Sequence, residues 1–225
     1  MPDTPIIRTN TPLSPNKILN AYKIGLFPMA DSYTSNTINW IEPNQRGIID
    51  LKELHIPKKI KSLMRKNKFT IKANTSLRAV INSCASAGNR KTNTWINKDI
   101  INSYAELGEN NICHCIECWD NEKLVGGLYG LAIGGVFFGE SMFSFTDNAS
   151  KIALVSLAIM LIKSNFKFID TQFITKHLTQ FGAKEIEQKD YLKLLNLSIN
   201  NHGIFFKLPT DITSSDLLHE FNQIS

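Results

Sequence analysis

The chain has 225 residues, of which 43% are hydrophobic and 20% are charged. This composition supports a packed core and argues against a disordered protein. The longest apolar run, residues 152–162 with Ser156 inside it, is shorter than the roughly 18–20 residues that cross a bilayer. Residues 1–5 carry no basic segment ahead of an apolar one. We therefore expect no membrane partner and a cytoplasmic location.

Positive charge is concentrated in one segment. The formal net charge is +5, yet residues 52–98 alone hold twelve Lys or Arg against one acid, Glu53. Such a segment attracts phosphate backbones, although a solvated Lys-rich face is the simpler alternative. The local concentration of basic residues favours a nucleic acid. The side chains expected to contact its backbone are Lys58, Lys61, Arg65 and Lys66.

The N-terminal part of the chain gives few regular patterns. Residues 1–13 form a polar tail that contains Pro and is expected to be loosely held. Ser14 and Pro15 suit the N-cap and first position of a helix that runs to Lys23. An irregular region is expected from Phe27 onward, followed by a strand at residues 48–51. We place a domain boundary at residue 55, which gives a small domain at 1–55 and a larger one at 56–225.

The larger domain alternates between helices and strands. Helices are predicted at residues 58–65, 76–86, 98–107, 149–164, 174–181 and 189–196. Strands are predicted at 69–72, 113–119, 123–132, 135–143, 166–172 and 203–207. Gly134-Gly135 reads as a hairpin turn. The pattern predicts an α+β or α/β protein with a mixed, largely antiparallel central sheet.

Three of the four cysteines cluster as Cys113-His114-Cys115-x-x-Cys118. On a strand, Cys113 and Cys115 would face one way, and His114 and Cys118 the other. Four ligands could not then converge on one tetrahedral ion. We expect reduced, buried cysteines and no metal.

Two short apolar segments carry the most informative polar residues. Glu140 and Met142 are predicted to share one face of the strand at 135–143, and Asp170 and Gln172 to share one face of the strand at 166–172. Carboxylates in so apolar a setting are costly unless they are partnered or used. A functional cleft and a satisfied structural network are both consistent with this pattern.

These residues carry a resemblance. The chain resembles the leucyl/phenylalanyl-tRNA–protein transferases in three successive segments. These are Gly139-Glu140-Ser141-Met142-Phe143-Ser144, Asn148-Ala149-Ser150-Lys151 and Ile169-Asp170-x-Gln172. Other pieces follow in the same order: Ala21-Tyr22-Lys23-Ile24-Gly25-Leu26-Phe27-Pro28, Trp40-x-x-Pro43-x-x-Arg46, Thr94-Trp95-Ile96, His114-x-x-Glu117-x-Trp119 and Leu124-Val125-Gly126-Gly127-x-Tyr129-Gly130. The resemblance covers roughly residues 14 to 196.

The resemblance implies a small N-terminal domain and an acetyltransferase-like (GNAT) domain. It also implies transfer of Leu or Phe, and weakly Met, from aminoacyl-tRNA to proteins that begin with Arg or Lys, which marks them for N-degron proteolysis. No cofactor is needed, because the donor is already an activated ester. Acetyl-CoA is further disfavoured because Phe145-Thr146-Asp147-Asn148 stands where a Gly-rich turn would receive a pyrophosphate. We expect a monomer.

Roles follow by matching motif positions. Asp170 should orient Gln172 or the incoming amine, Gln172 should contact that amine through its amide oxygen, and Glu140 should hold the cationic residue of the acceptor. An ion pair of Glu140 with Lys151 is the structural alternative. The aminoacyl pocket is expected from Leu128, Phe137, Met142, Leu154, Leu161 and Ile169. The terminal adenosine is expected on Trp95, Tyr104 and Met29, and the basic helix would hold the tRNA backbone.

The chain departs from the family pattern at several positions. Met29 follows Phe27-Pro28 where the family often has Trp, Cys115 replaces a Ser, and Phe145 replaces an Arg. These changes leave the reaction intact but bear on donor affinity and on the choice between Leu and Phe. The alternatives are a non-catalytic RNA-binding protein, a cell-wall precursor aminoacyl-tRNA transferase and an acyl-CoA N-acetyltransferase.

Overall fold

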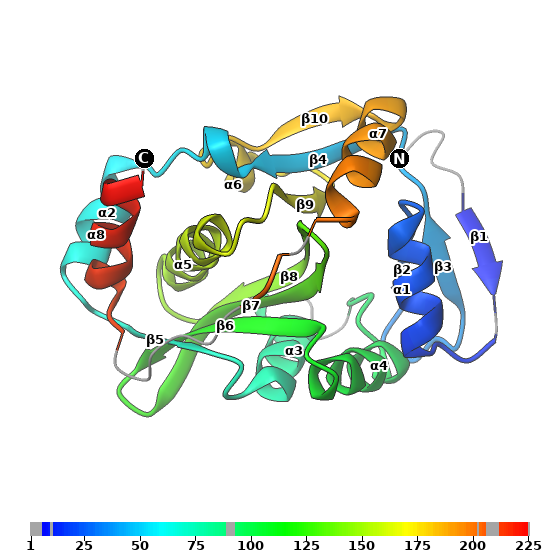
Figure 1. Cartoon of the computed structure of the whole chain (residues 1–225). Coiled ribbons are helices and arrows are strands. Elements are labelled where there is room, and N and C mark those ends of the chain that lie inside the picture. Colours follow the sequence, from blue (N-terminus) through cyan, green and yellow to red (C-terminus); the bar gives the residue numbers. More distant parts are fainter. Residues whose placement is uncertain (1–5, 10, 89–92, 202, 206–211, 225) are drawn as a thin grey trace.

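The centre of the molecule is a mixed seven-stranded sheet (Figure 1). The structure is a computed structural model that describes residues 6–9, 11–88, 93–201, 203–205 and 212–224. The strand order is β10-β4-β9-β8-β7-β6-β5, and neighbours run antiparallel except for the parallel pair β8 and β9. The strands are β4 (Gln45–Asp50), β5 (Thr70–Ala73), β6 (Cys113–Asp120), β7 (Lys123–Ile133), β8 (Val136–Ser144), β9 (Phe168–Gln172) and β10 (Lys184–Glu187). The predicted combination of helices with a mixed, largely antiparallel sheet is confirmed.

A second, three-stranded sheet and helix α1 (Pro15–Lys23) form a small N-terminal part. Its strands β1 (Ile6–Thr9), β2 (Phe27–Ala30) and β3 (Ile38–Ile41) lie in the order β1-β3-β2. The prediction of a loose tail is wrong for residues 6–9, which pair with β3. The irregular region predicted from Phe27 onward is wrong for β2 and β3. Pro28 argued against a strand at this position, because proline lacks the amide hydrogen that a strand donates. However, β2 is an edge strand, where this missing hydrogen is tolerated.

Strand β4 lies before the predicted domain boundary at residue 55. It nevertheless pairs with β9 on one side and β10 on the other, inside the large sheet. The small sheet ends at Ile41. The division at residue 55 therefore stays a prediction, and the large sheet contains strands from both sides of it.

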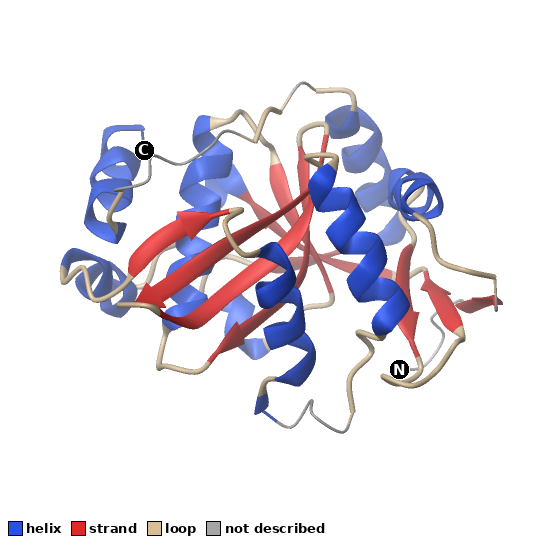
Figure 2. Ribbon diagram, turned by 90° about the horizontal axis from the view of Figure 1, so that it is seen from below, coloured by secondary structure: helices blue, strands red, loops and turns tan. Residues whose placement is uncertain are grey.

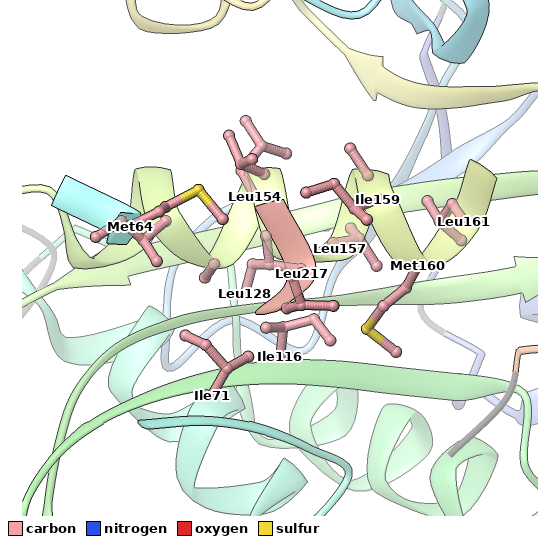
Figure 3. Packing of buried hydrophobic residues seen from close by; sticks show 14 of the residues in the cluster. Met64, Ile71, Ile116, Leu128, Leu154, Leu157, Ile159, Met160, Leu161 and Leu217 are labelled. Carbon is pink, nitrogen blue, oxygen red and sulfur yellow. The ribbon is translucent and has the colours of Figure 1, made fainter. Parts of the chain in front are cut away.

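Helices cover both faces of the large sheet (Figure 2). Helix α5 (Ala149–Lys163) packs on one face together with α2 (Lys58–Arg65) and α8 (Ser214–Ile224), and their side chains share one core (Figure 3). The other face packs against α1, α3 (Leu77–Ser86), α4 (Lys98–Glu109) and α7 (Gln188–Ile199). The short elements are the 3-10 turn Leu51–Glu53 and α6 (Lys176–Thr179). Within the residue ranges described, no helix is long and apolar enough to cross a membrane.

Most predicted elements of the larger domain are confirmed, with ends that differ by at most three residues. The hairpin turn is confirmed as well, with Gly134 at φ +59° between β7 and β8. Strand β10 and helix α8 were not predicted. The predicted strand at 203–207 is wrong for residues 203–205, which form no strand, and residues 206 and 207 lie outside the described part.

Strand β8 changes partner and face along its length. It pairs with β9 only at Val136–Phe138, after which the two strands separate. A register shift in the β7–β8 pairing leaves Glu140 as an extra residue, because Gly139 and Ser141 are opposite consecutive residues of β7. Such a bulge shifts the alternation of side chains by one position. Met142 therefore packs on the α5 side, while Glu140 contacts tyrosines of α1 and α4. The prediction that the two share one face is wrong.

Candidate functional site

A cavity of about 460 Å³ opens where β8 and β9 separate. Its walls come from β2, β7, β8, α5, β9 and the segment that follows β9. They are mainly apolar, and the apolar contributors include Phe27, Leu128, Met142, Leu154, Leu157, Ile169 and Leu178. The polar side chains at the cavity include Glu140, Ser141, Thr171, Gln172, Thr175 and His177. A mostly apolar cavity with a few polar groups is the usual form of a small-molecule site.

The structure divides the six residues expected in the aminoacyl pocket into two groups. Leu128, Met142, Leu154 and Ile169 line the cavity. Phe137 and Leu161 do not, because both are fully buried in the core between the sheet and α5. Their register in the motif placed them on the correct elements, but neither side chain reaches the cavity.

The three residues expected at the terminal adenosine also divide. Trp95 and Met29 line the cavity, and both are half-buried. Tyr104 is fully buried and is not part of the cavity wall, so it offers no free face on which a base could stack. Its hydroxyl instead lies 3.0 Å from that of Tyr22 and donates to Glu140 Oε2 at 3.2 Å.

Asp170 is fully buried and bound on every side by the protein. Arg46 donates from Nε to Asp170 Oδ1 at 2.9 Å and from Nη2 to Oδ2 at 2.7 Å. The Tyr191 hydroxyl donates to Oδ2 at 2.7 Å, and the Gln172 amide N–H donates to Oδ1 at 2.8 Å. Asp170 does not line the cavity. Its contact with a cavity residue is the hydrogen bond that it accepts from the Gln172 amide.

Gln172 has an unusual backbone. Its φ is +55°, a left-handed conformation that is rare outside Gly, Asn and Asp. The amide of Phe173 donates to the carbonyl of Thr171 at 2.7 Å, so Gln172 is the central residue of a tight three-residue turn. The hydrogen bond from its own amide to Asp170 fixes this turn. Strain of this kind is found preferentially at functional sites.

The turn ends the strand and directs the Gln172 side chain to the cavity. The residue is 7% exposed, and its Nε2 is buried without a hydrogen-bond partner. Thr171 Oγ1 and His177 Nε2, which also belong to residues of the cavity, are in the same state. Buried polar atoms without partners are rare and costly, so a bound ligand is the natural source of the missing contacts.

Glu140 is held by two tyrosines rather than by a lysine. Tyr22 donates to Glu140 Oε1 at 2.5 Å, and Tyr104 completes the cluster. The ion pair with Lys151 that we considered does not form, because Lys151 Nζ donates to Asn148 Oδ1. Burial raises the pKa of Glu140 to about 8, against the lowering effect of the two tyrosine hydrogen bonds. The carboxyl is thus mainly neutral at pH 7 in the empty site.

Four residues of this site received no role from the sequence. Arg46 and Tyr22 belong to segments that match the family motifs, but their spacing does not indicate their contacts with Asp170 and Glu140. Tyr191 lies on α7, twenty-one residues from its partner. His177 follows Gln172 by five residues, and a lone His in a polar segment gives no signal without the cavity around it.

The predicted basic helix is confirmed as α2, and its four predicted contact residues are at least partly exposed. It packs beside α8 on the α5 side of the sheet (Figure 1). Ile60 and Met64 are buried against the core, which leaves Lys58, Arg65 and Lys66 exposed to solvent. A nucleic acid could be bound here without disturbing the fold.

The cysteine cluster lies on β6 as predicted, with alternating faces. Cys113 and Cys115 are in the core on the α4 side, and Cys118 is in the core on the α5 side. His114 stacks on Phe205, with ring centroids 4.1 Å apart. No group of three or more His, Cys, Asp or Glu side chains suited to a metal ion is present among the residues that the structure describes.

The turn before α5 uses its amides within the protein. Phe145 and Thr146 donate to the carbonyl of Val125, Ala149 donates to the carbonyl of Thr146, and Ser150 donates to Ser144 Oγ. A pyrophosphate is usually bound by free amides at a helix N-terminus. These four amides already donate to acceptors within the protein. This fits the expectation from the sequence that acetyl-CoA is disfavoured.

The sequence comparisons, with family models and with curated relatives, agree on one family. The model of the leucyl/phenylalanyl-tRNA protein transferase matches residues 48–196, and the model of that family's N-terminal domain matches residues 11–44. A leucyl/phenylalanyl-tRNA–protein transferase of Paramagnetospirillum magneticum is 46% identical over 180 residues, which is 80% of this chain and 86% of the relative. One from Nitrobacter winogradskyi is 43% identical over 199 residues, 88% of each chain. Among solved structures, the C-terminal domain of a putative lysylphosphatidylglycerol synthetase from Agrobacterium fabrum has a TM-score of 0.43 and 9% identity, over 86% of this chain and 73% of that one.

Proposed function

Because the chain belongs to the leucyl/phenylalanyl-tRNA protein transferase family, we propose that it transfers Leu or Phe from aminoacyl-tRNA to the N-terminus of proteins. The observation that carries this proposal is the cavity, which joins an apolar wall to the polar pair Glu140 and Gln172. The acceptors begin with Arg or Lys, and the added residue marks them for degradation. The enzyme works in the cytoplasm as a monomer without a cofactor.

The apolar wall receives the side chain of the donated residue. Leu128, Leu154 and Ile169 surround a space suited to a branched or aromatic group. Such a wall distinguishes similar apolar side chains by only about 1–3 kcal/mol per methylene-sized difference. Met should therefore be accepted weakly, and shape should decide between Leu and Phe.

Glu140 receives the cationic residue of the acceptor. Its carboxyl is mainly neutral in the empty site, and a Lys or Arg side chain in contact would lower its pKa and ionise it. The two tyrosines already donate to both carboxyl oxygens, so they would stabilise that charged form. An uncharged or acidic N-terminal residue could not induce this ionisation.

Asp170 and Gln172 act as a unit. Arg46 and Tyr191 hold Asp170, and Asp170 holds the backbone turn that positions Gln172. The amide oxygen of Gln172 contacts the attacking amine. Asp170 is thus a positioning residue that does not itself meet the substrate.

The tRNA is held by its end and by its backbone. Trp95 and Met29, which line the cavity, take the terminal adenosine, and stacking on an aromatic ring contributes about 1–3 kcal/mol. Lys58, Lys61, Arg65 and Lys66 contact phosphates. The separation of β8 and β9 beside a central helix also supports assignment of the larger part to the acetyltransferase-like (GNAT) fold.

The test is transfer of labelled Leu from Leu-tRNA to peptides that begin with Lys, Arg, Asp or Ala. We expect label on the Lys and Arg peptides and none on the others, and loss of transfer with Gln172→Met. Label on a cell-wall precursor instead would identify the other class of aminoacyl-tRNA transferase. Salt-sensitive tRNA binding without any transfer would identify a non-catalytic RNA-binding protein.

A further inference from the structure

The cavity contains two buried nitrogen atoms without hydrogen-bond partners, Gln172 Nε2 and His177 Nε2. We propose that these two groups bind the carbonyl oxygen of the aminoacyl ester and stabilise it as it becomes an oxyanion. This inference rests on the proposed function and adds His177 as a further catalytic residue.

The reaction requires such donors. The amine nitrogen attacks the ester carbonyl carbon, a C–N bond forms, and the carbonyl oxygen takes up the displaced electron pair. Collapse of this intermediate breaks the C–O bond to the ribose, the amine nitrogen loses a proton, and the ribose oxygen gains one. The negative charge on the former carbonyl oxygen is the largest charge that develops, and preorganised N–H donors stabilise it most effectively.

The other ionisable groups nearby are already committed. Asp170 is bound by Arg46, Tyr191 and the Gln172 amide, and it does not line the cavity. Glu140 is bound by two tyrosines, and once the cation of the acceptor has ionised it, its negative charge would repel an oxyanion. Gln172 and His177 therefore stand out, among the described residues that line the cavity, by side-chain nitrogen atoms that are buried without a partner.

Both groups have the character that an oxyanion site needs. The NH₂ group of a Gln side chain can only donate, so its missing partner is an oxygen or another acceptor. Burial, with a smaller contribution from Lys151, lowers the pKa of His177, so its imidazole is neutral at pH 7. In the Nε2–H tautomer this ring donates a hydrogen bond without placing a second full charge in the cavity.

The backbone fixes both donors before the substrate binds. The strained turn at Gln172 is held by Asp170, and the His177 ring packs edge-on against Phe181 with centroids 6.1 Å apart. The carbonyl of His177 accepts a hydrogen bond from Gln180 Nε2 at 2.7 Å, which closes the C-terminal end of the short helix α6. Donors held in this way need little reorganisation when the charge develops, which is the source of their effect on rate.

The test compares His177→Phe, which keeps the ring packed on Phe181, with His177→Gln, which retains an Nε2 donor. The exposed His219 on α8 provides the matched control His219→Phe. Single-turnover transfer of Phe from Phe-tRNA to an Arg peptide is measured at saturating peptide. We expect His177→Phe to slow this step about 10²-fold with little change in the KM for Phe-tRNA. His177→Gln should recover most of the loss, and His219→Phe should match the wild type.

Gln172 has an equally direct test. Gln172→Glu keeps the acceptor oxygen but replaces the donor, whereas Gln172→Met removes both. We expect both variants to lose the fast step, and the loss in the double variant with His177→Phe to be smaller than the product of the single losses, since both groups bind one oxygen. Gln223→Glu on the exposed face of α8 is the matched control.

Two outcomes would overturn the inference while leaving the proposed function intact. One is a His177→Phe enzyme within about twofold of the wild type, far from the effect of a lost oxyanion donor. The other is a Gln172→Glu enzyme as fast as the wild type, which would make Gln172 an acceptor only. If His177→Phe does not give the wild-type circular dichroism and thermal midpoint, His177→Leu replaces it in the same comparison. A wild-type protein without transfer activity would instead refute the proposed function.

Discussion

Arg46 and Asp170 form a fully buried, bidentate ion pair between the adjacent strands β4 and β9. The Arg46 guanidinium also lies over the rings of Phe27 and Tyr191, at 4.8 and 4.6 Å from their centroids, and donates to the carbonyl of Gly25. One cation thus connects the small N-terminal sheet, the large sheet and α7. Asp170 in turn fixes the turn of Gln172, so the stability of this pair and the geometry of the site are linked.

Removal of one partner should therefore destabilise the protein strongly. Asp170→Ala leaves the Arg46 cation buried without its anion, and such a loss typically costs about 3–5 kcal/mol. Urea unfolding measures the change in the free energy of unfolding. The control is Lys184→Ala, which removes the exposed ion pair with Glu53 and should cost less than about 1 kcal/mol. Equal, small losses in the two variants would show that Asp170 is not the structural anchor described above.

The stability of the empty protein should depend on pH through Glu140. Its pKa is about 8 in the folded protein, against about 4.3 in an unfolded chain. The folded state therefore binds an extra proton between these values, so the contribution of Glu140 to stability is complete at low pH and is lost as the pH rises toward 8.

Thermal unfolding of Glu140→Gln beside the wild type isolates this contribution, because the remaining titratable groups are shared. Between pH 5 and about 8.5 we expect the wild type to lose more stability than the variant. Parallel pH profiles for the two proteins would contradict the raised pKa.

A substitution at Leu154, in the apolar wall of the cavity, should change the preference between Leu and Phe. A larger side chain at this position reduces the space for an aromatic ring more than the space for Leu, so Leu154→Phe should lower kcat/KM for Phe-tRNA at least about tenfold more than for Leu-tRNA. Leu161→Met lies on the same helix but away from the cavity and should leave the Phe-to-Leu ratio unchanged. A shifted ratio with Leu161→Met alone would instead move the pocket deeper into the core.

The contacts of α2 with tRNA should appear in the salt dependence of binding. Replacement of Lys58, Arg65 and Lys66 by Ala removes up to three phosphate contacts, each worth about 0.9 in the slope of log K against log salt. The slope should fall by about 2–3 units for this variant. Ala at Lys189 and Lys193 on α7 is the control, and an equal effect there would indicate diffuse attraction rather than a binding surface.

The sequence predicted the strongly patterned elements well. Helix α5 could be predicted because its apolar residues run almost without interruption, and α2 because Pro57 precedes its first turn. Strands β1 and β10 could not, since both are short edge strands without alternation whose pairing depends on distant segments.

Several residues of the motif segments and of the predicted site have structural roles that no local sequence pattern could indicate. Glu117, part of a quoted motif, is fully buried and accepts hydrogen bonds from the amides of Thr75 and Ser76 at the start of α3 and from Trp119 Nε1. Tyr104 donates a hydrogen bond to Glu140 and does not provide the stacking surface for adenine that the sequence led us to expect. The bulge at Glu140 reverses the face of Met142, and a single inserted residue of this kind leaves no trace in a hydrophobic pattern.

The most direct measurement is a crystal structure with a stable analogue of phenylalanyl-adenosine, in which an amide replaces the ester. We expect the phenyl ring to lie among Leu128, Leu154 and Ile169 and the adenine to contact Trp95. The carbonyl oxygen of the analogue should lie within hydrogen-bonding distance of Gln172 Nε2. An analogue bound elsewhere, such as in the polar pocket formed by Tyr33, Asn97 and Lys98, would contradict the assignment of this cavity as the transfer site.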